Sequence, residues 1–203
     1  MEALLQQLLN GLTLGSIYGL VALGLTLVYG ILHVPNFAHG ALYMVGAYVA
    51  YYVAGELGAS YWLAMIAAAV IVAGLAVACE RLVFHPLRNA PPIHDKIAAI
   101  GLLLFFEAVV QMYWGADFRR LDAPSHTIFH FAGLTLPAQR VLIIVAAFSL
   151  MGGLHLYLKK TLAGSTIIAM AQNREGAFLV GINANRVAMM TFAISGALAA
   201  VAS

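Results

Sequence analysis

Two histidines and an asparagine flank a proline between residues 30 and 40, inside an otherwise apolar stretch. Pro35 has no backbone N–H and biases Val34 away from helical angles, so a helix that reaches this point is expected to break. Asn36 can then cap a new helix that starts near Phe37. The sequence therefore predicts free backbone N–H groups and polar side chains at a helix N-terminus within an apolar region.

Two interpretations of this break are open from the residues alone. In the first, it is an ordinary short cytoplasmic turn between two membrane spans. In the second, the helix is discontinuous or re-entrant, and its N-terminal dipole points into a transport pathway. The residues that would then line the pathway are Asn36, Phe37, His39 and Gly40.

Glu107 is the one ionisable residue deep inside an expected membrane span, 97–114. A carboxylate at membrane depth is costly and is a functional candidate by default. No Lys or Arg within a span is available to pair with it. It is either a hydrogen-bonded structural residue that faces the bundle or a polar lining of the pathway. A proton relay would need several ionisable groups, so the sequence does not favour one.

The stretch 159–186 is far less apolar than its flanks, and another apolar segment follows it. We expect a cytoplasmic amphipathic helix that Ser165 caps and that ends near Gly181, in the left-handed conformation. Asn183 or Asn185 then caps the next span. The apolar stripe of this helix is Ile167, Met170, Ala171 and Phe178. Such a helix either lies on the membrane surface or docks into a groove of a cytosolic partner.

The first apolar segment carries Gly11, Gly15 and Gly19 at four-residue spacing. A glycine stripe of this kind allows another helix backbone to approach closely. Tight packing within the subunit is the favoured interpretation. A dimer interface and a lining of the pathway are the alternatives.

No catalytic constellation is found, since HExxH, GxSxG, Walker A and CxxC motifs are absent. His33 and His39 are poorly spaced for a metal on one helix face, and His126 and His130 lie in a loop without a companion carboxylate. The single cysteine, Cys79, cannot form an internal disulfide. We therefore expect neither an enzyme nor a metal or cofactor site.

The elements that position these residues follow from the composition. Of 203 residues, 63% are apolar and only 9% are charged, whereas a soluble domain carries about a quarter charged residues. This excludes a soluble enzyme, a disordered tail and a nucleic-acid binder. It predicts an all-α, polytopic bundle, because only helices and closed barrels satisfy their backbone in hydrocarbon and no ten-residue alternating strands are seen. The six expected spans are 8–32, 37–54, 61–78, 97–114, 141–158 and 187–203.

The placement of the basic residues predicts the orientation. If six spans alternate, seven of the ten Lys and Arg residues lie on one side and three on the other. The N-terminus is then outside, and the loops 80–96 and 159–186 are cytoplasmic. The loop 115–140 is external, with a short apolar hairpin around 128–136. The last segment has no closing anchor, so we expect residues 1–203 to be one transmembrane domain from the N-terminal portion of a longer protein.

Several stretches together resemble the LivH-type permease of branched-chain amino acid ABC importers. They are 10–19, 22–30, Asn36-Phe-Ala-His-Gly40, Gly164, Gln172-Asn-Arg-Glu-Gly-Ala-Phe-Leu-Val-Gly-Ile-Asn183 and 195–200. The resemblance covers nearly the whole chain, and its Asn-Phe-Ala-His-Gly element is the most specific part.

The resemblance implies a multi-pass permease subunit in the bacterial inner membrane, which imports apolar, branched-chain amino acids and binds no cofactor. Its implied partners are two cytosolic ATP-binding subunits that hydrolyse ATP, a second homologous permease and a periplasmic amino-acid-binding protein. The resemblance implies that the stretch 159–186 is the loop that couples the permease to the ATPase. The implied coupling residues are Arg174, Glu175, Ala177, Gly181 and Asn183. Sugar permeases of the related ribose type have a broken helix at the position of 36–40, which favours the pathway interpretation.

Three other functions compete with this one. A permease of the same architecture could carry urea, short amides or another amino acid. An ion-coupled secondary transporter or a channel is disfavoured by the large polar loop and the single ionisable residue within the spans. A structural membrane scaffold would explain the glycine stripe but not the polar break near Pro35.

Overall fold

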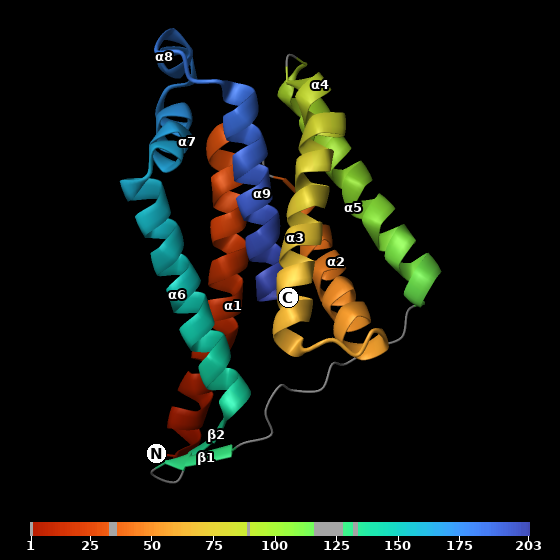
Figure 1. Cartoon of the computed structure of the whole chain (residues 1–203), viewed down its shortest axis with the longest axis vertical. Helices are drawn as coiled ribbons and strands as arrows, with labels where there is room; N and C mark the ends of the chain where they lie inside the picture. Colours follow the sequence, from red (N-terminus) through yellow and green to blue (C-terminus); the bar gives the residue numbers. More distant parts are fainter. Residues whose placement is uncertain (1, 33–35, 89, 116–127, 132–133) are drawn as a thin grey trace.

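A computed structural model describes residues 2–203 apart from 33–35, 89, 116–127 and 132–133. The chain forms a bundle of membrane-length helices with short helical segments at one end and a β-hairpin at the other (Figure 1). The helices are α1 (Glu2–Leu32), α2 (His39–Tyr51), α3 (Tyr61–Cys79), α4 (His85–Leu87), α5 (Pro92–Trp114), α6 (Ala138–Lys160), α7 (Leu162–Gln172), α8 (Arg174–Leu179) and α9 (Ala184–Ala202). Two π-helical turns, η1 (Tyr52–Glu56) and η2 (Glu80–Phe84), extend α2 and α3.

Five helices in the described part of the chain are long and apolar enough to cross a membrane. They are Leu4–Ile31, Tyr61–Leu87, Ile93–Trp114, Ala138–Lys160 and Ala184–Ala202. The expected span 37–54 is instead the 13-residue α2 followed by the π-helical turn η1. The all-α, polytopic fold is therefore confirmed, with five membrane-length helices among the described residues where six spans were expected.

Helix α9 is the centre of the bundle, because it packs against α1, α2 and α3 and buries most of its length. Small residues make this packing possible. A Cβ on Gly196 would lie 2.8 Å from the carbonyl oxygen of Val72, and one on Gly46 would lie 2.7 Å from the Cα of Ala200. At both crossings the helix backbones are too close for any larger side chain.

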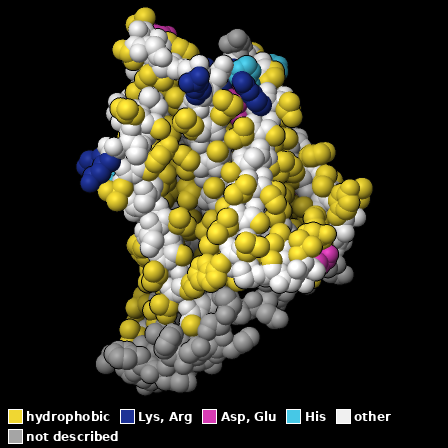
Figure 2. Space-filling model, viewed as in Figure 1, with side chains coloured by type: hydrophobic (Ala, Val, Ile, Leu, Met, Phe, Trp, Pro, Cys, Tyr) yellow, Lys and Arg dark blue, Asp and Glu magenta, His cyan; other side chains and the backbone are white. Residues whose placement is uncertain are grey.

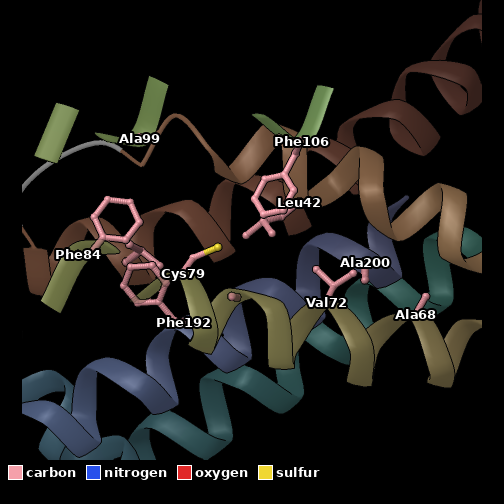
Figure 3. Packing of buried hydrophobic residues seen from close by; sticks show 12 residues of the cluster. Leu42, Ala68, Val72, Cys79, Phe84, Ala99, Phe106, Phe192 and Ala200 are labelled. Atoms are coloured by element: carbon pink, nitrogen blue, oxygen red, sulfur yellow. The ribbon is translucent and has the colours of Figure 1, made fainter. Parts of the chain in front are cut away.

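Larger apolar side chains fill the space between α2, α3, α5 and α9 (Figure 3). The rings of Phe84 and Phe192 are 5.5 Å apart and join the end of α3 to α9. Phe106 extends the same cluster to α5, where it lies close to Leu42 of α2. The start of α2 thus packs into this cluster through Ala41 and Leu42.

The two ends of the bundle differ in charge. Helices α4, α7 and α8 lie at one end, which we call the basic end because of its residues Arg81, Arg88, Lys159, Lys160, Arg174 and Arg186. Figure 2 shows the Lys and Arg side chains of one face gathered toward this end, with mostly hydrophobic side chains over the body of the bundle. The two loops that the sequence placed on one side therefore do share a side.

The opposite end carries the N-terminus and the hairpin of β1 (Ile128–Phe131) and β2 (Leu134–Pro137), which pair antiparallel. This confirms the hairpin expected around 128–136. Aromatic residues gather where α2 and α5 end and α3 begins, and Tyr48 and Trp114 stack with their ring centroids 5.3 Å apart. Tyr and Trp at such positions are typical of a membrane–water interface.

Candidate functional site

The break before α2 is organised by Asn36. This residue is 4% exposed, and its Oδ1 accepts a hydrogen bond of 3.1 Å from the backbone N–H of Ala38. The Asn36 carbonyl accepts a second, also 3.1 Å, from the N–H of His39. The sequence predicted that Asn36 caps a helix starting near Phe37. Instead α2 begins at His39, its N-cap is Ala38 without a side-chain hydrogen bond, and Asn36 forms the turn just before it. Pro35 and His33 lie outside the described residues.

His39 connects three helices. Its Nε2 lies 3.1 Å from the carbonyl oxygen of Val21 on α1, and its Nδ1 lies 3.2 Å from the hydroxyl of Ser195 on α9. A carbonyl only accepts, so Nε2 carries the proton, and in the neutral ring Ser195 donates to Nδ1. Both side chains are only 2% exposed. We call His39, Ser195 and the Val21 carbonyl the His39 cluster.

Gly24 provides the space for this cluster. A Cβ at Gly24 would lie 2.9 Å from the Cε1 of His39 and 3.1 Å from the carbonyl oxygen of Ser195. The imidazole therefore sits directly against the α1 backbone. The role of Ser195 was missed by the sequence analysis, because a lone serine in an apolar helix has no spacing signal of its own.

The His39 cluster lies well inside the bundle. At about 1.5 Å per residue, Val21 is roughly 16 Å from the end of α1 at Leu32, and Ser195 is roughly 16 Å from the start of α9 at Ala184. Helix α2 therefore begins deep between α1 and α9 rather than at the end of the bundle. This is the geometry of a discontinuous helix.

The residues that lead into α2 and its first turn alternate between two environments. Asn36 and His39 are buried, whereas Phe37 is 48% exposed and a Cβ on Gly40 would meet open space. At helical spacing, the face of Gly40 continues through residues 44, 47 and 51. Ala47 and Tyr51 line a hollow of about 280 Å³ at the other end of α2. The open face of α2 thus begins at Phe37 and Gly40 and continues through half-buried residues 44, 47 and 51 to this hollow.

Glu107 lies in the middle of α5 and is half-buried. Helix α5 faces the core through Ala99, Phe106 and Val110. Among the described residues, no hydrogen bond or ion pair joins Glu107 to the His39 cluster. The structure thus keeps the two predicted polar features of the pathway on separate helices.

The polar stretch 159–186 folds differently from the single helix that we expected. Thr161, not Ser165, caps the first helix, α7, and its Oγ1 accepts from the N–H of Gly164 at 2.9 Å. Asn173 then ends α7 and caps α8, because its Oδ1 accepts from the N–H of Gly176 at 2.8 Å. A short polar side chain that bonds the nearby backbone competes with helix continuation. Two helices therefore replace the expected one.

The exit from α8 follows the sequence prediction. Gly181 has a φ of +81°, the left-handed conformation expected of a helix stop. Asn183, rather than Asn185, caps α9, since its Oδ1 accepts from the N–H groups of Asn185 and Arg186 at 3.0 and 3.2 Å.

Helices α7 and α8 have different surroundings. Helix α7 packs onto the bundle and buries Ile167 and Met170. In helix α8 only Ala177 is buried. The three side chains after Ala177 are exposed: Phe178 51%, Leu179 89% and Val180 76%. Phe178 therefore does not belong to the buried stripe that the sequence indicated. Helix α8 projects at the basic end with an apolar tip of residues 178–180 (Figure 1).

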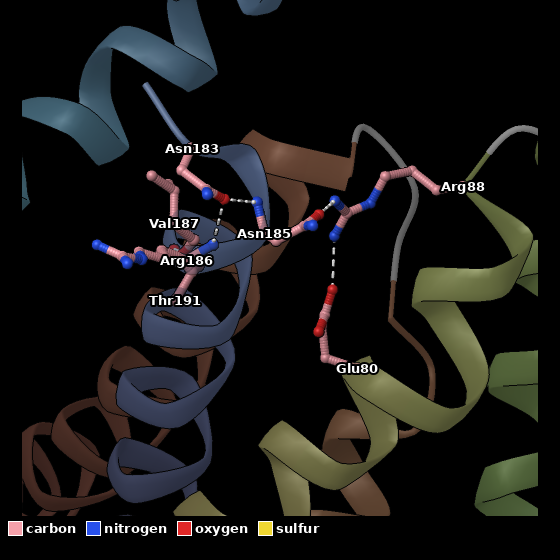
Figure 4. A network of polar contacts seen from close by, with 7 residues as sticks. All are labelled: Glu80, Arg88, Asn183, Asn185, Arg186, Val187 and Thr191. Carbon is pink, nitrogen blue, oxygen red and sulfur yellow. Dashed lines mark hydrogen bonds and ion pairs between the residues drawn. The ribbon is translucent and has the colours of Figure 1, made fainter. Parts of the chain in front are cut away.

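A buried ion pair fastens the start of α9 to the end of α3 (Figure 4). The guanidinium of Arg88 donates to Oε1 of Glu80 and to Oδ1 of Asn185, both at 2.5 Å. Glu80 is fully buried and the Arg88 side chain is 13% exposed. The sequence analysis counted Arg88 only for orientation, since nothing in the sequence joins residues so far apart.

The glycine stripe of α1 is only partly used within the described structure. A Cβ on Gly19 would lie 3.2 Å from the Met151 side chain of α6, whereas one on Gly11 or Gly15 would meet nothing within 4 Å. In the described part of the chain, no group of three or more His, Cys, Asp or Glu could hold a metal ion.

Comparison with known proteins gives the same family that the sequence resembles. Residues 7–203 match the family described as "Branched-chain amino acid transport system / permease component". The chain is 35% identical to the high-affinity branched-chain amino acid transport system permease protein BraD of Pseudomonas aeruginosa, over 98% of this chain and 69% of BraD. It is also 35% identical to the permease protein LivH of Escherichia coli K12, over 98% of this chain and 68% of LivH.

A more distant relative is a probable LivH of Methanocaldococcus jannaschii, which is 32% identical over 90% of this chain and 60% of the relative. No solved structure matches the chain significantly. The match over residues 7–203 and the 35% identity to two named permeases decide the family. The chain belongs to the family of branched-chain amino acid transport permeases.

Proposed function

We propose that this chain is a membrane-spanning subunit of an ATP-driven importer that carries branched-chain amino acids across the bacterial inner membrane. The observation that carries the proposal is the start of α2 deep in the bundle, where His39 bonds Val21 and Ser195. Transporters use discontinuous helices to place a helix N-terminus at membrane depth. The names of the relatives supply the substrate class.

The open face of α2 is the proposed wall of the translocation pathway. Phe37 and Gly40 belong to this face, and Asn36 and His39 fix it from behind. An apolar amino acid needs a path with few fixed charges, and this face has none between residues 37 and 51. Glu107 is proposed as a further polar contact of the pathway from α5.

The basic end is the proposed cytoplasmic end, with the N-terminus outside. Seven of the ten Lys and Arg residues support this orientation. Helix α8 and its apolar tip, residues 178–180, are then the docking element for the cytosolic ATP-binding subunits. A second, homologous permease would complete the pathway, and a periplasmic binding protein would deliver the amino acid.

The proposed route of coupling follows the polar contacts at the basic end. Movement of α8 would reach the start of α9 through Gly181 and Asn183. From there the Asn185–Arg88–Glu80 contacts join α9 to α3. Since α9 also holds Ser195, the same helix would carry the movement to the His39 cluster.

Uptake by proteoliposomes tests this proposal. The full gene product is reconstituted with its ATP-binding subunits and second permease, and uptake of labelled leucine is measured with ATP inside or outside. We expect uptake only when ATP is on the side of the ATP-binding subunits, and none with hydrolysis-deficient subunits. Uptake that ignores ATP but follows a proton or sodium gradient would overturn the proposal. Uptake of urea or an amide in place of leucine would keep the architecture and correct the substrate.

A further inference from the structure

We propose that a groove between α4, α8 and the start of α9 binds an acidic side chain of the cytosolic ATP-binding subunit; this rests on the proposed function. The groove has a volume of about 550 Å³. Its lining residues are His85, Arg88, Arg174, Phe178, Gly181, Ile182, Asn183, Ala184 and Asn185. It combines residues from two segments of the basic end, 85–88 and 174–185, that lie far apart in the sequence.

The charge of the groove is positive. Arg88 and Arg174 line it, and the residues that line it include no Asp or Glu; because Arg88 is paired with Glu80, the net positive charge comes from Arg174. Arg88 is held in place by Glu80, which lies fully buried behind it, and by Asn185. A guanidinium that is already fixed in this way loses little side-chain freedom when it binds a further acceptor.

Arg174 is the uncompensated charge of the groove. Within the described structure, no ion pair is formed by Arg174, and its guanidinium lies 6.0 Å from the ring centroid of Phe178. The side chain is half-buried, so a carboxylate that reached it would be partly shielded from water. Arginine binds a carboxylate through two parallel hydrogen bonds, which makes a carboxylate the expected ligand.

The surroundings of the groove favour a protein over a lipid headgroup as the source of that carboxylate. Phe178, the first residue of the apolar tip 178–180, lines the groove, and the whole tip is exposed. Apolar side chains around a central charge exclude water in protein interfaces. Helix α8 is also the outermost element at the basic end (Figure 1), where a cytosolic protein would make contact.

The groove thereby gives the loop 85–88 a role in docking. A carboxylate held by Arg174 next to Arg88 would contact the central residue of the Glu80–Arg88–Asn185 network, and Asn185 lines the same groove. The partner would then touch the segment after α4 and the start of α9 together rather than α8 alone.

Co-purification of the assembled transporter tests the inference. The variant is Arg174→Glu, and the matched control is Arg186→Glu, because Arg186 is exposed at the same end but does not line the groove. Figure 4 shows the Arg186 side chain pointing away from Arg88. We expect Arg174→Glu to lower recovery of the ATP-binding subunits by about tenfold or more, and Arg186→Glu to leave it close to wild type. Arg174→Lys, which keeps the charge, should retain part of the binding.

Salt dependence and lipid content complete the test. Recovery with wild type should fall as NaCl rises, and this dependence should flatten in Arg174→Ala. Equal recovery with the Arg174 and Arg186 variants would overturn the inference. So would unchanged recovery with Arg174→Glu together with loss of a bound anionic lipid in native mass spectrometry. Wild type that never retains ATP-binding subunits would contradict the proposed function itself, which keeps the two failures distinct.

Discussion

The Nδ1 atom of His39 lies 3.2 Å from the hydroxyl of Ser195 and joins the first residue of α2 to the middle of α9. The two residues are 156 positions apart in the sequence. Both groups are buried, so neither can exchange this bond for one with water. The start of the discontinuous helix is therefore tied to the helix that leads back to α8.

Removing the Ser195 hydroxyl should loosen this tie. In Ser195→Ala the Nδ1 of His39 loses its donor, and we expect the free energy of unfolding to fall by about 1 kcal/mol. The initial rate of leucine uptake should fall as well, because the start of α2 is no longer held. Thermal unfolding in detergent and proteoliposome uptake measure the two effects. Ser149→Ala, at an exposed serine of α6, is the control and should change neither.

Gly24 and Gly11 form a matched pair on α1. A Cβ at Gly24 would lie 2.9 Å from His39, whereas one at Gly11 would meet nothing within 4 Å. Gly24→Ala should therefore lower the free energy of unfolding by about 1–3 kcal/mol through overpacking. Gly11→Ala should be neutral or slightly stabilising, since alanine is the better helix former. Equal melting temperatures for the two variants would show that His39 can move aside without cost.

The Glu80–Arg88 pair should be asymmetric to mutation. Arg88→Met leaves a fully buried carboxylate without its cation, so we expect a loss of about 3–5 kcal/mol in the free energy of unfolding. Glu80→Gln should cost less, because its amide oxygen can still accept from Arg88. The double variant should be more stable than Arg88→Met alone. Chemical or thermal denaturation of the four proteins gives the comparison, and additive losses would contradict the pairing.

Asn36 provides a test of the break that leaves the rest of the bundle unchanged. Asn36→Leu removes the acceptor for the N–H of Ala38, whereas Asn36→Asp keeps an oxygen at that place. We expect Asn36→Leu to lower uptake by roughly fivefold or more, the factor that corresponds to about 1 kcal/mol, while co-purification with the partners persists. Asn36→Asp should retain more transport than Asn36→Leu. Normal uptake by Asn36→Leu would favour the interpretation of this segment as an ordinary turn between two spans.

Local chemistry could be predicted from the sequence wherever one residue acts on its own neighbours. The left-handed Gly181 and the cap at Asn183, one of the two candidates, follow from short-range rules and are found where they were expected. The turn before α2 is found near Asn36, but the helix starts later than expected and Asn36 does not cap it. The same rules missed the division between α7 and α8. Asn173 was not considered as a cap, because the segment was treated as one continuous amphipathic helix.

The sequence by itself determined that this is a membrane protein, since so few charged residues cannot coat a soluble globule. It also determined the helical class and the positions of the apolar segments, because hydrophobicity and caps are local properties. Only the tertiary structure decided the depth at which α2 begins and the partners of His39 and Arg88. The depth and the partners depend on how helices far apart in sequence pack. A glycine can indicate a close helix crossing, but not which distant segment it meets, as Gly46 meets Ala200 and Gly196 meets Val72.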